Sequence, residues 1–283
     1  MEKIPLTYRC WDQGIPPQQI KLQIPGWAGD KNAHTDGDVP QPWHCTPYVE
    51  ASTYGLELIY TFEGECHVTI VDGKVVFSGD FSKDAIRLPH MTMPPFMTFA
   101  PGHFGMSSCL DIKVPNGYVL RTEPHPRFYT DHTNTVPCCI PGHLSTTWWP
   151  KIFFVVFKNP LPDQTLIFRK GEPFGQILIL PQRISYDIKE MSSEEAFKRN
   201  FLDENINKYA HKISKNNWHD YIGHNFNDKY KILNNIFVKK GLDGVNRFLD
   251  EIDNKLLTPQ VMKFKTKPII RKKNEGFSDQ KKD

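Results

Sequence analysis

Histidine is the residue type in this chain that could most readily bind a metal or transfer protons. Eight of the 11 histidines precede residue 150. Imidazoles joined by a carboxylate such as Glu57 or Asp131 could bind iron, copper or zinc, which favour nitrogen and carboxylate ligands. The candidate metal ligands are His44, His67, His103 and His143. A metal-dependent oxygenase or hydrolase, with ligands drawn from distant strands, is therefore one functional hypothesis.

The spacing of the histidines favours a second interpretation. On one strand, His-x-His or His-x-Asp/Glu would place two ligands on the same face, because side chains alternate. Neither pattern occurs within the predicted core, residues 46–185, and no Gly-x-Ser-x-Gly nucleophile motif is present in the chain. Structural or surface histidines are therefore the alternative to a metal centre.

Four short blocks in the first 180 residues point to another chemistry. They occupy residues 51–58, 114–118, 141–144 and 168–178. Their order and spacing resemble the motifs of the trimeric dUTP pyrophosphatases (dUTPases), which have a β-clip fold. The stretch from Pro42 to Phe174 also resembles a bacterial domain family of unknown function, which implies no activity.

The dUTPase resemblance implies roles for individual residues. Glu57 keeps a carboxylate where the family holds Mg²⁺, and Trp148 replaces a tyrosine that stacks on the nucleotide. Ser145 stands where the family's water-activating aspartate would be, and serine is a poor base without a partner. The ligand-binding candidates are Glu57, Tyr118, His125, Arg127, Ser145, Trp148 and Gln176. The resemblance leaves the catalytic residues unknown.

The leading functional hypothesis is a degenerate dUTPase-like protein without dUTP pyrophosphatase activity. It would bind a small, nucleotide-related ligand in a cleft between the subunits of a homotrimer, and family analogy allows Mg²⁺ as cofactor. Iron, copper or zinc would be the cofactor under the metal-enzyme hypothesis. A third hypothesis is a structural or assembly protein whose helical extension meets a partner.

The elements that must position these residues form a mainly β chain with a C-terminal α-helical extension. Many short apolar segments with frequent turns are typical of a sandwich, barrel or clip. The sequence predicts a Pro/Gly-rich N-terminal arm, a β-clip-like core, a helical extension and a basic flexible tail. Their bounds are 1–45, 46–185, 186–265 and 266–283.

Local patterns predict particular strands. Residues 66–77 form a hairpin around the two-residue turn Asp72-Gly73. The apolar run 152–157 indicates a strand in the centre of a sheet. Residues 166–168 and 176–180 are expected to pair with each other around the turn at 170–172.

The segment after residue 190 changes to helical periodicity. Ser192 and Glu195 fit a capping box at a helix start, and Phe197, Phe201 and Leu202 follow at helical spacing. A second helix is predicted to begin near Leu242. Its apolar stripe, expected to pack, consists of Leu242, Val245, Leu249, Ile252 and Leu256.

Composition limits the remaining classes. The net charge is +3, with a surplus of basic residues after position 180 that leaves nucleic-acid binding open. No apolar run reaches 18 residues and the N-terminus does not resemble a secretory signal, so we expect a cytoplasmic protein without a membrane span. The six cysteines contain no CxxC pair, and the adjacent Cys138 and Cys139 suit no ordinary disulfide.

Overall fold

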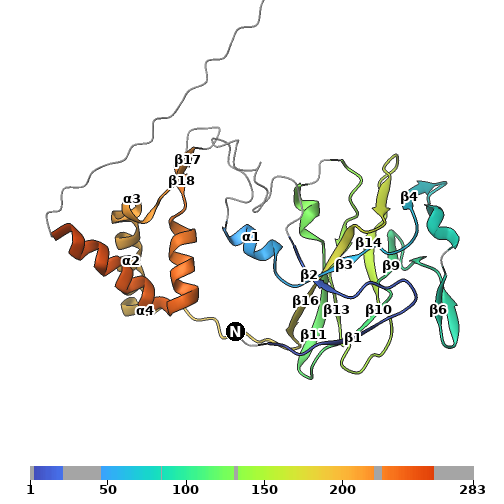
Figure 1. Cartoon of the computed structure of the whole chain (residues 1–283), viewed down its shortest axis with the longest axis horizontal. Coiled ribbons are helices and arrows are strands. Elements are labelled where there is room, and N and C mark those ends of the chain that lie inside the picture. The colour runs from blue at the N-terminus through green and yellow to red at the C-terminus, as the bar shows by residue number, and fades with distance from the viewer. Residues whose placement is uncertain (1–2, 22–45, 84, 131–132, 220–224, 258–283) are drawn as a thin grey trace, which may run out of the picture. The chain divides into compact units, whose positions relative to one another are not determined.

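The chain folds into two compact units (Figure 1). A computed structural model describes residues 3–21, 46–83, 85–130, 133–219 and 225–257. The first unit comprises residues 1–190 and 216–228, and the second comprises residues 191–215 and 229–283. All the described strands belong to the first unit. The predicted tail, residues 266–283, lies outside the described residues.

A five-stranded sheet brings the four sequence blocks together in the first unit. Its order is β13-β11-β16-β3-β2, and every pairing is antiparallel. The strands are β2 Gln18–Gln19, β3 Leu56–Ile59, β11 Tyr118–Glu123, β13 Gly142–Leu144 and β16 Pro173–Pro181. Each block supplies one strand, so residues as far apart in the chain as Leu56 and Ile177 become neighbours.

Smaller antiparallel sheets complete the first unit. One has the order β12-β14-β9-β8 and another the order β15-β4-β5, while β1 pairs with β10, β6 with β7 and β17 with β18. Their strands are β1 Thr7–Cys10, β4 Glu65–Val71, β5 Lys74–Gly79, β6 Ile86–Leu88, β7 Met91–Met93, β8 Phe96–Thr98, β9 His103–Ser107, β10 Leu110–Lys113, β12 Cys139–Ile140, β14 Phe154–Lys158, β15 Leu166–Arg169, β17 Asn217–His219 and β18 Asn225–Asn227. The mainly β class, with helices toward the C-terminus, is confirmed.

An aromatic cluster fills the core between these sheets. Phe96 and Phe168 lie 5.5 Å apart between ring centroids, edge to face, and Phe168 also meets Phe157 at 5.3 Å. Tyr60 and Phe104 are fully buried against the same cluster. Edge-to-face pairs at these distances add to the free energy gained by burying the rings. This core holds the sheets that position the site.

Two strand predictions are confirmed and one pairing prediction is wrong. β4 and β5 form the predicted hairpin, with Asp72 and Gly73 both at positive φ as a two-residue turn requires. β14 lies between β12 and β9, in the interior of its sheet. However, β15 pairs with β4, whereas β16 pairs with β3 and β11. The turn at Gly171 sends the two strands into different sheets instead of joining them as a hairpin.

Short helices flank the sheets. Helix α1 Thr46–Ser52 leads into β3, and the 3-10 turn η4 Pro126–Thr130 follows β11. A second 3-10 turn, η3 Asp80–Lys83, follows β5. The position of α1 and η4 next to β3 and β11 matters because both lie over the polar end of the main sheet.

The second unit contains α2 Ser193–Lys208, α3 Ala210–Ile213 and α4 Lys229–Leu257. The predicted cap is confirmed, since the Ser192 hydroxyl accepts a hydrogen bond from the backbone N–H of Glu195 at 3.2 Å. Helix α4 is interrupted at Gly241, whose φ of 67° and ψ of −171° are not helical. The predicted second helix therefore corresponds to the part of α4 that follows this break.

The burial of the helices corrects one expectation. Val245 and Leu249 are buried as predicted, but Leu242 is exposed. Phe197 and Phe201, at helical spacing on α2, are 70% and 58% exposed. The helical spacing of Phe197 and Phe201 thus identifies an apolar face of α2, and the second unit does not bury that face. No helix within the described residues combines the length and the apolar content needed to cross a membrane.

Candidate functional site

Three polar side chains from neighbouring strands form a row across the main sheet. The register pairs Gln176 of β16 with Glu57 of β3 on one side and with Glu123 of β11 on the other. Residues opposite each other in antiparallel strands project from the same face. The fold therefore brings Glu57, Gln176 and Glu123 side by side from positions that are far apart in the sequence.

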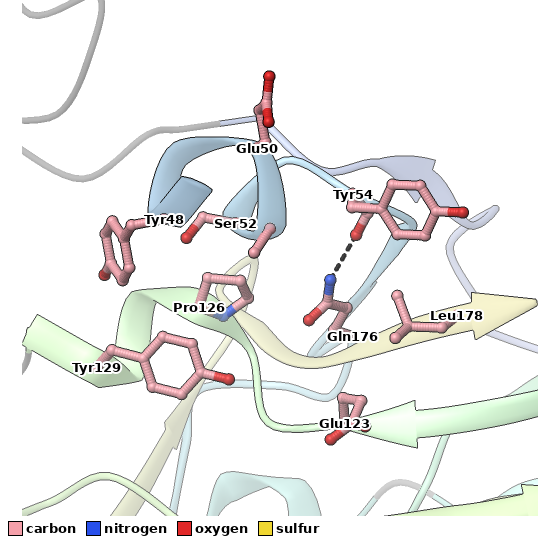
Figure 2. Close-up of a pocket in the computed structure, with 10 residues that line it drawn as sticks. Tyr48, Glu50, Ser52, Tyr54, Glu123, Pro126, Tyr129, Gln176 and Leu178 are labelled. Carbon is pink, nitrogen blue, oxygen red and sulfur yellow. Dashed lines mark hydrogen bonds between the residues drawn. The ribbon is translucent and has the colours of Figure 1, made fainter. Parts of the chain in front are cut away.

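Two of the three polar side chains in this row are buried. Glu57 is 3% exposed and Gln176 is 5% exposed. The Gln176 amide donates a hydrogen bond to the backbone carbonyl of Tyr54 (Figure 2). Burying a carboxylate costs free energy unless nearby groups compensate it. Such a group in a β core is more typical of a site than of packing alone.

The group that faces the Glu57 carboxylate is the imidazole of His125. Its Nε2 lies 3.5 Å from Oε2 of Glu57, and neither atom has a closer hydrogen-bond partner among the described residues. The Nδ1 atom accepts a hydrogen bond from the backbone N–H of Arg127 at 3.2 Å. In the neutral ring the proton therefore belongs on Nε2, directed at Glu57.

Burial decides the charge of this histidine. Desolvation lowers the pKa of His125, and the proximity of Glu57 only partly opposes that shift. A second proton on Nδ1 would also break the hydrogen bond from Arg127. At neutral pH the imidazole that faces Glu57 is therefore uncharged.

A pocket of about 470 Å³ opens beside this row. Figure 2 shows α1 above it, with Gln176 and Leu178 on β16 along one side and Tyr129 of η4 along another. Its lining residues are Tyr48, Glu50, Ala51, Ser52, Tyr54, Glu123, Pro126, Tyr129, Gln176 and Leu178. The volume lies within the range of small-molecule sites, roughly 300–1,000 Å³.

Two arginines near the pocket are held by carboxylates. Arg121 pairs with Glu123 and also approaches Nε2 of His143 at 3.3 Å. Arg127 donates a hydrogen bond to Glu172 at 2.5 Å. Neither guanidinium belongs to the pocket lining. The guanidinium of Arg127, a candidate from the sequence, therefore binds the Glu172 carboxylate. Its backbone N–H contacts the site, because it donates a hydrogen bond to His125.

The structure separates the sequence-derived candidates into two groups. Glu57, His125 and Gln176 come together, with Arg127 beside them. Tyr118 begins β11, roughly 17 Å along the strand from Glu123 at about 3.3 Å per residue.

Ser145 and Trp148 belong to the second group. Ser145 follows directly after β13, whose last residue, Leu144, pairs with Leu120 near the start of β11. Trp148 is 70% exposed and lies 5.5 Å from Trp149 between ring centroids. Neither residue lines the pocket.

The candidate metal ligands are dispersed. His67 is on β4 with Nε2 2.9 Å from a carboxylate oxygen of Glu65, and Nδ1 of His103 donates to the Pro101 carbonyl at 3.0 Å. His143 is on β13, in a third sheet, and His44 lies outside the described residues. Within the described part of the chain, no group of three or more His, Cys, Asp or Glu side chains could hold a metal ion.

The sequence interpretation missed the aromatic part of the site. Tyr48, Tyr54 and Tyr129 line the pocket, together with Glu50 and Glu123. Tyr48 and Tyr129 both lie outside the four sequence blocks. Glu123 lies five residues after the second block, at the end of β11 and two residues before His125. Cross-strand register, which the sequence does not specify, makes it part of the row.

Comparison with known proteins gives a structural resemblance only. No protein-family model and no curated protein matches the chain. A mutant dUTPase of Staphylococcus bacteriophage 80alpha with dUpNHpp matches at a TM-score of 0.35 and 9% identity, covering 67% of this chain and 89% of that one. A dUTPase mutant of phage phi11 of S. aureus matches at 0.34 and 8%, covering 67% and 97%. Both matched proteins are phage dUTPases.

Proposed function

We propose that this chain is a dUTPase-like protein that binds a small nucleoside-type ligand in the pocket beside Gln176. The observation that supports the proposal is the row of Glu57, Gln176 and Glu123 at the edge of that pocket, of which Glu57 and Gln176 are buried. Such a row offers hydrogen-bond donors and acceptors to a polar ring, while the neighbouring tyrosines offer it stacking surfaces. Turnover of dUTP is not part of this proposal.

The side chains present do not fit a dUTPase type of hydrolysis. Ser145, at the motif position of the water-activating aspartate, has no carboxylate and does not line the pocket. Mg²⁺ needs an open octahedral shell with several waters. The Glu57 carboxylate is 3% exposed and faces an imidazole, so it leaves no room for that shell. We therefore expect no pyrophosphate release from dUTP, with or without Mg²⁺.

The oligomeric part of the proposal is a homotrimer with the ligand site at a subunit boundary. The motif resemblance supports the trimer. Trp148 does not line the pocket of its own chain, so the nucleotide contact that the motif resemblance implies for it requires a neighbouring copy. A cytoplasmic location accompanies this proposal.

A thermal-shift titration with uridine, deoxyuridine, cytidine and dUMP tests the ligand class. A ligand that binds the folded state alone must raise the melting temperature. We expect a shift with at least one nucleoside, its loss in Tyr129→Leu, and its retention in Asp72→Asn, a change in the distant β4–β5 turn. Absence of any shift, or an unchanged shift in Tyr129→Leu, would overturn the proposed function.

The variant Trp148→Ala tests the shared site separately. If the pocket is completed by another subunit, this exposed substitution weakens nucleoside binding although Trp148 does not line the pocket of its own chain. Unchanged affinity would place the whole site within one chain and would remove the inter-subunit part of the proposal.

A further inference from the structure

A single hydrogen bond fixes the orientation of the Gln176 side-chain amide. Its nitrogen donates to the backbone carbonyl of Tyr54, which can only accept, so the amide oxygen must point away from Tyr54 (Figure 2). That oxygen accepts no hydrogen bond from the residues that the structure describes. Because Gln176 is only 5% exposed, bulk water is largely excluded, and a buried acceptor without a donor costs free energy.

A second acceptor lies beside Gln176 on β11. The register pairs Glu123 with Gln176, and paired residues in antiparallel strands have Cβ atoms roughly 4.5–5.5 Å apart. The Glu123 carboxylate accepts a hydrogen bond from Nε of Arg121, and no other hydrogen bond reaches it from the described part of the chain. Gln176 and Glu123 both line the pocket. The pocket wall therefore presents an amide oxygen and a carboxylate oxygen from adjacent strands.

One amino group on an aromatic ring matches this pair of acceptors. Its two N–H bonds diverge by about 120° and each forms a hydrogen bond of about 2.9 Å, so its two acceptors lie about 5 Å apart. That separation agrees with the spacing of side chains paired across two antiparallel strands. A ring carbonyl in the same place would set its own oxygen against both acceptors and leave them without a donor.

We infer that the pocket prefers nucleosides whose base carries an exocyclic amino group, with that amine donating to both Gln176 and Glu123. This inference rests on the proposed function, because it names the kind of base that the same pocket binds. Such an amine is neutral, so the preference concerns the hydrogen-bonding pattern and not the net charge. Among the nucleosides proposed above, cytidine has this group and uridine does not.

Three matched pairs of nucleosides, titrated into the full chain by ligand-observed NMR, isolate the amino group. Guanosine and inosine differ only in the 2-amino group, and adenosine and purine riboside differ only in the 6-amino group. Cytidine carries a 4-amino group where uridine has a carbonyl. We expect the amino member of at least one pair to bind about 10-fold more tightly or better, because its partner leaves the two acceptors unpaired. Equal affinities within all three pairs would overturn the inference.

The variant Glu123→Gln tests where the amine is held. Glutamine keeps the shape of the side chain and can keep an oxygen toward Arg121 while its N–H groups face the pocket. In the pair that shows the preference, the ratio of affinities should fall by roughly 5-fold or more, because a donor replaces one acceptor of the amine. The ratio separates this effect from damage to the fold, which would lower both affinities alike. An unchanged ratio would place the amine elsewhere and overturn the inference.

The variant Glu172→Gln is the matched control. Glu172 is the carboxylate partner of Arg127, as Glu123 is of Arg121, but it does not line the pocket. The same chemical change at this position should leave the ratio of affinities within about 2-fold of its original value. A fall as large as that in Glu123→Gln would mean that the loss of an arginine's partner, and not the loss of an acceptor, changes the ratio. That result would overturn the inference.

The two proposals fail in different ways. If uridine or cytidine binds and Tyr129→Leu abolishes that binding, while no pair of nucleosides shows a preference, the proposed function stands and the amino preference falls. If no nucleoside binds at millimolar concentration, the proposed function falls and the inference falls with it.

Discussion

Gly55 sets how closely β3 approaches β16, and therefore where Glu57 meets Gln176. Its φ is +91°, and a Cβ atom at this position would lie 2.4 Å from the carbonyl oxygen of Ile177. Gly117 has a similar φ of +84°, but a Cβ there would meet nothing within 4 Å. Substitution of Gly117 would therefore cost only backbone strain, whereas substitution of Gly55 would also cost a steric clash with the backbone.

We predict that Gly55→Ala destabilises the first unit more than Gly117→Ala does. Placing a side chain at positive φ costs about 1–2 kcal/mol at either position. The contact with the Ile177 carbonyl adds roughly 1–3 kcal/mol at Gly55 alone, since overpacking against a fixed backbone is not relieved by rotamer changes. Urea denaturation of both variants measures the difference, and equal costs would show that β3 can shift away from β16.

The buried histidine gives the protein a predictable response to acid. The folded-state pKa of His125 is lower than its ordinary value of 6.5. Below about pH 6.5 the unfolded chain takes up a proton that the folded chain resists, so the unfolded state binds more protons there. The stability linked to this residue is present above that pH and is lost as the pH falls through the folded-state pKa.

We predict that His125→Gln reduces this acid sensitivity. Glutamine retains a side-chain N–H that can face Glu57 but does not titrate between pH 5 and 8. The free energy of unfolding, measured at pH 7.5 and 5.5, should fall less in the variant than in the unmodified chain. An identical fall in both proteins would mean that other groups cause the acid response.

At the scale of elements, the features that the sequence predicts are those that depend on interactions between residues close together in the chain. The β4–β5 hairpin depends on two turn residues, and the start of α2 depends on Ser192, so local sequence specifies both. The pairing of β15 with β4, which is 100 residues earlier, depends on the packing of the whole core. A local pattern around Gly171 therefore predicted the strands but not their partners.

The site was predictable to the same extent. Motif order identified Glu57, His125 and Gln176, because each lies in or directly after a strand that the motifs mark. Tyr48 and Tyr129 enter the pocket from α1 and η4, and only the folded arrangement of β3, β11 and β16 brings these two elements together. No spacing in the sequence encodes that contact.

The exposed face of α2 leads to a prediction about stability. Phe197→Ser and Phe201→Ser should each change the free energy of unfolding by less than about 0.5 kcal/mol, as is usual for exposed positions. Leu249→Ala on α4 should cost about 2–5 kcal/mol, because it leaves a cavity in the core of the second unit. Chemical denaturation followed by helical circular dichroism measures all three. A large loss for either serine variant would indicate that α2 packs its aromatic face in solution.

At the scale of the whole molecule, the proposed trimer makes a prediction about mixtures. Trp148→Ala and Tyr129→Leu would each weaken or remove binding alone if a site combines Tyr129 of one copy with Trp148 of another. Random mixing of the two variants in a closed trimer should restore about a quarter of the sites. A boundary is intact only when one subunit supplies an unchanged Tyr129 and its neighbour supplies an unchanged Trp148. Both variants are unfolded and refolded together, and nucleoside binding is compared with each variant refolded alone. Mass photometry of the mixture gives the assembly state, with three times the 32.8 kDa of one chain expected. Recovered binding at that mass would require a shared site, whereas a mixture that binds no better than its components would confine the pocket to single chains.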